Sequence, residues 1–305
     1  MPLEQGEREK LARFLEKHDL MKGCLALDLD GTALTEDRGR IYISGPVDAG
    51  VRAFHKLKRP VIINTLRFPL SVIQTIGNAW YELTEMPIPT VLLNGSILGS
   101  IECVNHELIY KEIVAFPMTA REIELVLEGV QQLLEQGIDE IILFHYDRDW
   151  RAGEAIWTPK PERVEGLRKK FRSASMVKSS ALAELQAELG ARDICMMSLF
   201  VDRPEDTLMA YQHSKRNSFF TRKGVDKASG LREIASRFEL SLADSIGAGD
   251  TEMDAFLNEV GLAVIVGGLN VPYQGKSDTL RVGLPADLGD LIGAAAELAG
   301  KALAA

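Results

Sequence analysis

Two acidic residues stand two positions apart in the segment at 28–32, which reads Asp-Leu-Asp-Gly-Thr and directly follows an apolar run. Alternate side chains of an extended chain point to the same side, so Asp28 and Asp30 are expected to lie close together. Two carboxylates this close repel each other unless a cation lies between them, and oxygen ligands favour Mg²⁺. With the metal bound, one carboxylate can act as a nucleophile while the other transfers a proton. The alternative is an Asp-Gly turn with two solvated acids.

A glycine-rich segment at 247–254, Gly-Ala-Gly-Asp-Thr-Glu-Met-Asp, follows another apolar run. Glycines let the backbone approach a ligand closely, and a following helix would direct N–H groups toward it. Asp250 is then placed to bind a metal at the strand end, and Asp254 lies one helical turn further on the same face. The alternative is an ordinary helix start, where the dipole favours acidic residues.

Two weaker signals complete the set. Lys227 follows Asp226 at the start of a predicted helix, where a cation opposes the helix dipole, so another requirement could hold it there. A surface lysine is the alternative. Thr65 follows Asn64 at the end of an apolar run and says nothing by itself.

The elements that must position these residues alternate between short apolar runs and helical periodicity. Strands are expected at 24–28, 61–63, 91–93 and 262–266, with helices between them. This alternation predicts an α/β fold whose parallel sheet presents the residues listed above at the carboxyl ends of its strands.

A different pattern begins after Asn94-Gly95. Extended runs at 97–101 and 108–114 predict a hairpin, and Thr119 with Glu122 forms a capping-box pattern before a helix. Further strands are expected at 141–144 and 194–201, and a helix at 204–214. We therefore expect a discontinuous core, residues 1–95 and 221–305, interrupted by an α+β domain at 96–220.

The overall composition excludes several classes of protein. The chain of 305 residues has 35 Lys and Arg against 44 Asp and Glu, a net charge of −9, which disfavours binding to nucleic acid or anionic membranes. No apolar stretch is long enough for a membrane span. The three cysteines match no zinc or disulfide pattern, and the N-terminus does not resemble a secretory signal, so a cytoplasmic location is expected. The oligomeric state is not indicated.

Together, the four motifs in this order resemble the haloacid-dehalogenase (HAD) superfamily, and its Mg²⁺-dependent phosphatases in particular. The resemblance spans residues 21–290. It implies a Rossmann-like parallel-sheet core. The long insert is similar to the large α/β cap of the Cof-type and sucrose-phosphate or mannosyl-phosphoglycerate phosphatases, with Asn94-Gly95 at the hinge.

The resemblance also implies a role for each motif residue. Asp28 would attack phosphorus and form an aspartyl-phosphate, and Asp30 would act as general acid and base. Asp28, Asp250 and the backbone carbonyl of Asp30 would hold Mg²⁺, with Asp254 supporting them. Thr65, Leu66 and Lys227 would contact the phosphate. Further candidates for substrate contact are Arg67, Asn94, Arg148 and Arg151.

Two positions depart from the family pattern. Met253 stands where many relatives have Asn, so Glu252 or Asp254 would have to supply that polar contact. Leu66 stands where Gly is common and narrows the approach to the phosphate.

The sequence thus predicts a Mg²⁺-dependent phosphomonoester hydrolase of a small phosphorylated metabolite, with a sugar phosphate favoured by the resemblance. A phosphotransferase or mutase could use the same aspartyl-phosphate with a second hydroxyl as acceptor. A phospho-acceptor signalling module also uses paired Asp, Thr and Lys, but needs neither the insert nor Asp30. A binding protein that has lost activity is disfavoured by the intact acidic residues and Lys227.

Overall fold

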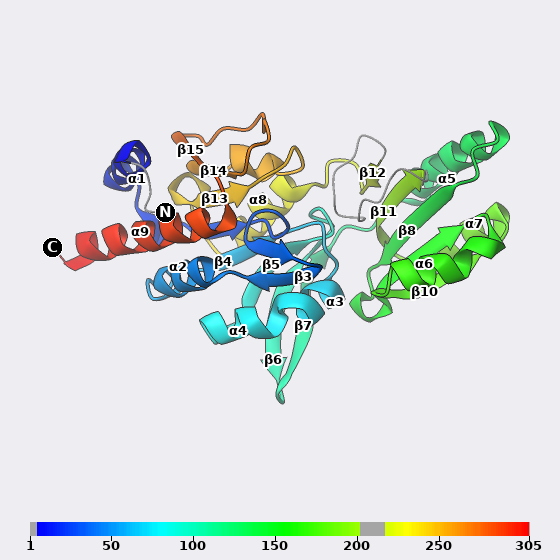
Figure 1. Cartoon of the computed structure of the whole chain (residues 1–305), viewed down its shortest axis with the longest axis horizontal. Coiled ribbons are helices and arrows are strands. Elements are labelled where there is room, and N and C mark those ends of the chain that lie inside the picture. Colours follow the sequence, from blue (N-terminus) through cyan, green and yellow to red (C-terminus); the bar gives the residue numbers. More distant parts are fainter. Residues whose placement is uncertain (1–4, 202–216, 305) are drawn as a thin grey trace.

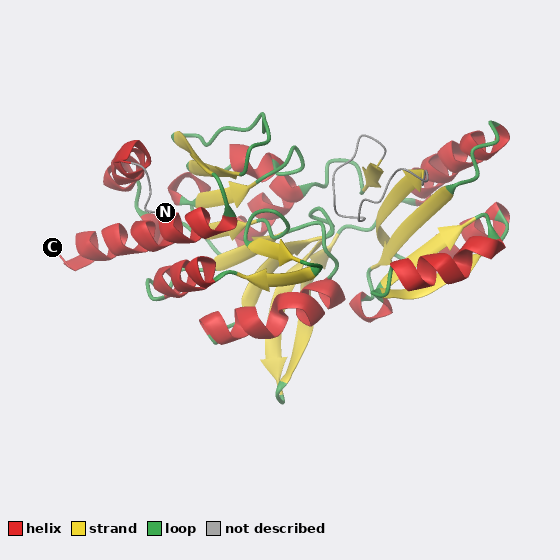
Figure 2. Cartoon of the chain, viewed as in Figure 1, coloured by secondary structure: helices red, strands yellow, loops and turns green. Residues whose placement is uncertain are grey.

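The computed structural model describes residues 5–201 and 217–304, and within them a large sheet, a smaller sheet and a short hairpin (Figures 1 and 2). The large sheet has eight strands. In spatial order they are β15 (Asp278–Val282), β14 (Leu262–Val266), β13 (Ile246–Gly249), β1 (Leu25–Leu27), β4 (Val61–Asn64), β5 (Ile88–Leu92), β6 (Ile97–Val104) and β7 (Glu107–Ala115). The first six are parallel and the last two antiparallel. The predicted α/β fold with a parallel sheet is confirmed.

Helices cover both faces of the parallel part. α2 (Gly45–His55) and α9 (Pro285–Ala304) pack on one face, and α8 (Lys227–Arg237) packs on the other. Leu25 and Leu27 of β1 belong to the first apolar cluster, whereas Ala26 belongs to the second. Because both faces are covered, strand residues of either parity are buried, which explains the continuous apolar runs in the sequence.

The remaining helices of this part lie around that framework. α1 (Gln5–Lys17) contacts α9 and β15. A continuous helical stretch follows β4 and consists of α3 (Pro69–Val72), the π-helical turn η2 (Ile73–Gly77) and α4 (Asn78–Thr84). Short 3₁₀ turns are η1 (Leu20–Lys22), η5 (Leu242–Asp244) and η6 (Ala255–Asn258).

The second sheet has five strands, mostly antiparallel. In spatial order they are β10 (Ala174–Ser179), β9 (Glu154–Thr158), β8 (Ile141–Asp147), β11 (Ile194–Val201) and β12 (Asn217–Phe220). α5 (Ala120–Glu135) and α7 (Leu182–Gly190) share an apolar cluster with it, α6 (Val164–Lys170) contacts β10, and η3 (Trp150–Ala152) and η4 (Pro161–Arg163) are 3₁₀ turns. The capping box predicted at Thr119 and Glu122 is present. The helix expected at 204–214 lies outside the described residues.

The hairpin β6–β7 corrects one part of the predicted organisation. The sequence analysis placed residues 97–115 in the inserted domain, but β6 pairs with β5 and extends the large sheet. The hairpin pattern in the sequence does not show which sheet the hairpin will join. In the structure, apolar residues of β6 such as Ile97 and Ile101 are buried in the same apolar cluster as residues of the large sheet. The division of the chain into two domains stays a prediction, with this hairpin reassigned to the larger sheet.

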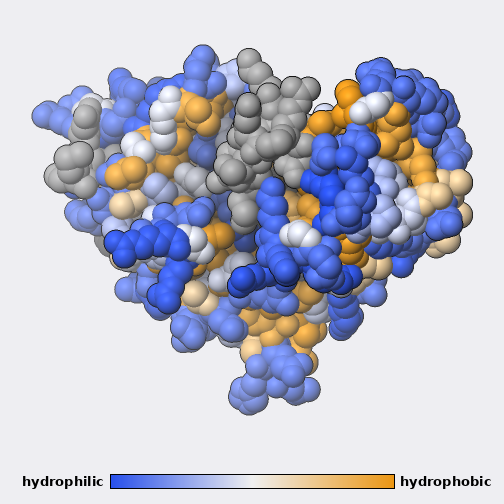
Figure 3. Space-filling model, turned by 45° about the vertical axis from the view of Figure 1, so that its right-hand side comes forward, coloured by the Kyte–Doolittle hydropathy of each residue, from blue (hydrophilic) through white to orange (hydrophobic). Residues whose placement is uncertain are grey.

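The tip of this hairpin projects from the molecule. In Figure 3 the projecting tip is hydrophilic, with apolar surface directly beside it. Val104 and Ile113 are among the exposed apolar side chains of these strands. None of the helices in the described part of the chain combines the length and apolar character that crossing a bilayer requires.

Candidate active site

Four strand ends meet at one edge of the large sheet, as their parallel order requires. Asp28 follows β1, Thr65 follows β4, Asn94 is two residues past β5, and Asp250 follows β13. A cavity of about 380 Å³ opens there. Its lining includes seven of the predicted site residues, namely Asp28, Asp30, Thr65, Leu66, Arg67, Lys227 and Asp250.

Lys227 is the central cation of this cavity. Its side chain is only 2% exposed, and its Nζ donates to Asp28 Oδ1 at 2.6 Å and to Asp254 Oδ1 at 2.7 Å. Asp226 caps α8 by accepting a hydrogen bond from the Ser229 backbone N–H, so the helix begins with Lys227. The unfavourable position of a lysine at a helix start is therefore offset by two buried carboxylates.

The segment after β13 is a turn, not the helix start that the sequence predicted. Asp254 Oδ2 accepts hydrogen bonds from the backbone N–H groups of Asp250 and Thr251, each at 2.9 Å. Only the four-residue 3₁₀ turn η6 follows. Asp254 thus positions the Asp250 backbone with one oxygen and holds Lys227 with the other.

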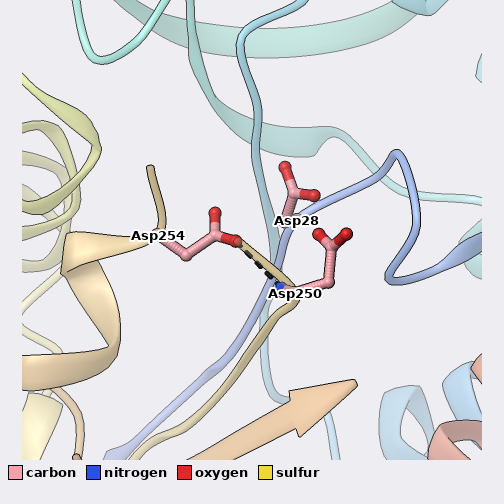
Figure 4. A group of neighbouring side chains, drawn as sticks. All are labelled: Asp28, Asp250 and Asp254. Atoms are coloured by element: carbon pink, nitrogen blue, oxygen red, sulfur yellow. Dashed lines mark hydrogen bonds between the residues drawn. The ribbon is translucent and has the colours of Figure 1, made fainter. Parts of the chain in front are cut away.

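Figure 4 shows how the acidic side chains lie. The carboxylates of Asp28 and Asp250 are next to each other, whereas that of Asp254 is turned toward the Asp250 backbone nitrogen. Oxygens from all three residues lie within 4.8 Å of one another. Thr32 Oγ1 donates to Asp250 Oδ1 at 3.0 Å, which fixes that carboxylate.

The charges in this cluster do not balance. Burial raises the pKa of Asp28 well above its ordinary value, and the charges of Asp254 and Asp250 act in the same direction, although Lys227 opposes them. Burial, and then the charge of Asp254, raises the pKa of Asp250 to about 6. The Lys227 pKa is raised because Asp254 and Asp28 outweigh its desolvation. Three carboxylates around one ammonium leave excess negative charge, and their hard oxygens fit Mg²⁺.

Asp30 and Arg67 form a pair at the wall of the cavity. Arg67 Nε and Nη2 donate to the two Asp30 oxygens at 2.7 and 2.6 Å. Arg67 is buried, and its Nη1 also donates to Thr75 Oγ1 in η2 at 3.1 Å. This bidentate pair fixes the orientation of the Asp30 carboxylate.

The loop after β5 braces the other strand ends and does not line the cavity. The backbone N–H of Asn94 donates to the Thr65 carbonyl at 3.4 Å, and that of Leu93 to the Arg67 carbonyl at 3.2 Å. Gly95 has φ +88°, and a Cβ there would lie 2.1 Å from the Asp226 carbonyl oxygen. The loop therefore packs directly against the residue that starts α8.

Arg148 and Arg151 lie in the second sheet's β8–β9 connection and not in the lining of the cavity. Arg148 forms a bidentate pair with Glu112 of β7, with Nη2 at 2.7 Å and Nε at 3.1 Å from its oxygens, and Arg151 stacks on Trp150. Trp150 in turn makes an edge contact with Tyr110 of β7, with ring centroids 6.5 Å apart. These contacts join the two sheets.

Sequence reasoning missed part of the cavity wall. The hairpin of β2 (Leu34–Asp37) and β3 (Arg40–Ile43) contributes Thr35, Glu36 and Ile41 to the lining, which also includes Leu269. An Asp-Arg-Gly turn between extended residues at 37–39 was the available signal for this hairpin. Thr32 was part of the first motif but had no assigned role.

The sequence matches a known protein family over most of its length. A family model of haloacid dehalogenase-like hydrolases covers residues 25–271. The chain belongs to this family. The resemblance to the HAD superfamily and the expected hydrolase class are thereby confirmed. No curated protein matches this HAD-like chain in sequence.

Solved structures share the fold of this HAD-like chain at low identity. BT1666 of Bacteroides thetaiotaomicron, described as a phosphatase of the superfamily, has a TM-score of 0.63 and 16% identity, with 92% of this chain and 96% of that chain covered. The HAD subclass IIB sugar phosphatase BT4131 has a TM-score of 0.61 and 17% identity, covering 89% and 97%. TM0651 of Thermotoga maritima has a TM-score of 0.58 and 18% identity, covering 89% and 96%.

Replacing Gly95 with alanine is expected to destabilise the protein and lower its activity. The new Cβ would meet the Asp226 carbonyl and displace the start of α8, which carries Lys227. We expect a loss of about 1–3 kcal/mol in unfolding free energy, measured by urea titration. Gly137→Ala is the matched control, because Gly137 also has positive φ but nothing lies within 4 Å of its Cβ position. Equal losses of stability and activity in both variants would contradict the bracing role.

The metal-free protein is expected to lose stability as the pH rises from about 4 to about 7. Burial raises the pKa of Asp250 from its ordinary value of 3.8 to about 6 in the folded chain, so the folded state binds more protons than the unfolded state in this window. The stability that comes from protonated Asp250 is fully present below pH 3.8 and is lost as the pH rises above about 6. The measurement is urea unfolding in chelator, with Asp250→Asn as the reference and Mg²⁺ added back. A difference between the two proteins that does not change with pH, or no stabilisation by Mg²⁺ near neutral pH, would contradict it.

Proposed function

We propose that this protein is a Mg²⁺-dependent phosphomonoester hydrolase that works through a phosphorylated Asp28. The observation that carries the proposal is the placement of the Asp28 carboxylate 2.6 Å from the Lys227 ammonium, at a cavity whose wall also contains Asp30. A nucleophile, a cation for the phosphoryl oxygens and a second carboxylate for proton transfer are the groups that this reaction needs.

The substrate we propose is a small phosphorylated metabolite, with a sugar phosphate favoured. The cavity of about 380 Å³ suits a small molecule. BT4131, which shares the fold, is described as a sugar phosphatase. Thr35 and Glu36 add polar groups to the lining that could contact the alcohol part of the substrate.

In the first step, an oxygen of Asp28 attacks phosphorus and the bond from phosphorus to the ester oxygen breaks. Asp30 donates its proton to the departing alcohol oxygen. Lys227 and Thr65 bind phosphoryl oxygens, with Leu66 beside them in the same loop. Once Asp30 has given up its proton, Arg67 holds the resulting carboxylate by both oxygens, which keeps it in place for the second step.

In the second step, Asp30 accepts a proton from water as the water oxygen attacks phosphorus. The bond between phosphorus and Asp28 breaks, which releases phosphate and restores both carboxyl groups. The second hydrogen bond of Lys227, to Asp254, would hold the ammonium group in position while Asp28 changes charge.

Asp28 and Asp250, with the backbone carbonyl of Asp30, are the proposed Mg²⁺ ligands. The metal would supply positive charge that offsets the repulsion between the carboxylates and the charge of the phosphoryl group. Asp254 is better suited to support than to direct ligation, since both of its oxygens already accept hydrogen bonds.

The variant Asp28→Asn is expected to lose hydrolysis by more than about a thousandfold, because an amide cannot form the acyl-phosphate. The measurement is phosphate release from a panel of sugar, polyol and nucleotide phosphates, with Mg²⁺ and with chelator. Asp48→Asn, on the exposed surface of α2, is the control and should retain full activity. Appreciable turnover by Asp28→Asn would refute the nucleophile. Activity that is unchanged in chelator would refute the metal.

The variant Arg67→Lys is expected to lower kcat by about tenfold or more, because lysine cannot hold both Asp30 oxygens. The change in KM should be smaller if Arg67 acts mainly through Asp30. Steady-state kinetics on the best substrate of the panel measure both constants. Arg52→Lys, which alters an exposed pair with Asp48, is the control. A rise in KM alone would assign Arg67 to substrate binding instead.

A further inference from the structure

A second cavity lies at the smaller sheet and has a different lining from the cavity described above. It has a volume of about 240 Å³. Side chains of His145, Asp147, Ser175 and Arg192 line it, together with the segment Ala152–Gly153. None of these residues lines the cavity that contains Asp28.

The alternation of β8 places His145, which lines this second cavity, on the opposite face of the strand from Tyr146. The Tyr146 ring packs against Phe68, the residue that precedes α3, with centroids 5.5 Å apart. His145 is adjacent in the strand and therefore points to the opposite face. The second cavity is a separate site and not an extension of the first.

His145 is the unusual residue of this cavity. It is only 1% exposed, and within the described part of the chain neither ring nitrogen has a hydrogen-bond partner. Burial, followed by the charges of Lys178 and Arg192, lowers its pKa to about 3. The imidazole is therefore neutral near pH 7, with one N–H donor and one nitrogen acceptor to satisfy. Buried polar groups without partners are costly, so a bound molecule would stabilise this arrangement.

The charges around His145 compensate one another. Arg192 lies 3.9 Å from Asp147 and 3.6 Å from Glu188, and Lys178 forms an ion pair with Glu188. An ionic ligand would have to compete with these pairs. The Ser175 hydroxyl lies within hydrogen-bond distance of the carbonyls of Ala152 and Glu154, and its single proton is shared between them or donated to one of them. The hydroxyl oxygen can therefore accept a hydrogen bond from a ligand in the cavity. An uncharged ligand that both donates and accepts hydrogen bonds fits this set of groups.

We propose that this cavity binds a small uncharged polyol. Hydroxyl groups donate to and accept from the two nitrogens of His145, while Asp147 accepts and Arg192 donates at the entrance. The proposal is independent of the proposed phosphatase activity, because no residue of the catalytic cavity takes part in it.

The test is the imidazole ¹H–¹⁵N spectrum of the full chain, with glycerol, xylitol and sorbitol as probes. The His145 signals are identified by their absence in His145→Phe. His106→Asn removes the signals of an exposed histidine and serves as the control. We expect at least one polyol to shift the His145 signals saturably while the signals of the other histidines stay unchanged. Shifts that increase linearly with the concentration of every polyol would overturn the proposal, because they would show that no polyol binds specifically in the cavity.

Substitutions and charged probes test the predicted contacts. Arg192→Met should weaken polyol binding about tenfold, and Arg151→Met, outside this cavity, should not change it. Equal affinities in the two variants would overturn the assigned contacts. Glycine and inorganic phosphate should give no saturable shift. A saturable shift with either of these and none with the polyols would show that the ligand is an ion.

Discussion

The buried contact of one ammonium group with two carboxylates organises the proposed active site. Lys227 lies between Asp28 and Asp254 with almost no exposure to water, at a depth where an unpaired charge of either sign would be strongly unfavourable. The capping of α8, the turn after β13 and the end of β1 must therefore come together for any of the three charges to be buried. The same contact leaves Asp250 short of positive charge, which is the physical reason to expect a divalent cation.

Backbone contacts between loops maintain this arrangement. The turn at Leu93–Gly95 holds the carbonyls of Thr65 and Arg67 on one side and packs against Asp226 on the other. Asn64 adds a link, because its Nδ2 donates to the Lys227 carbonyl at 3.0 Å. Each strand end is thus held by contacts with the neighbouring strand end. These contacts help to fix the positions of the side chains that line the cavity.

The sequence predicted the residues of the site better than their contacts. Asp28, Thr65 and Asp250 could be found because each follows an apolar run, and parallel strands bring such positions to one edge. The Arg67–Asp30 pair could not, because it depends on how the loop after β4 folds back over the end of β1. The sequence analysis predicted a helix start after Asp250, because acidic residues are common both at helix starts and in turns. The hydrogen bonds from the Asp250 and Thr251 backbone N–H groups to Asp254 show that the segment is a turn. The sequence predicted the hairpin β6–β7, but it did not predict that this hairpin joins the large sheet.

That hairpin has two tasks. It connects the large sheet to the smaller one along the chain. It also contacts the β8–β9 connection of the smaller sheet, because Glu112 pairs with Arg148 and Tyr110 packs against Trp150. A segment transplanted from another family member after residue 115 would be connected correctly, but Glu112 and Tyr110 of β7 would lose Arg148 and Trp150 as partners. An exchange of the inserted region, in evolution or in engineering, therefore also requires changes in β7, because residues of β7 help to set the orientation of the inserted region.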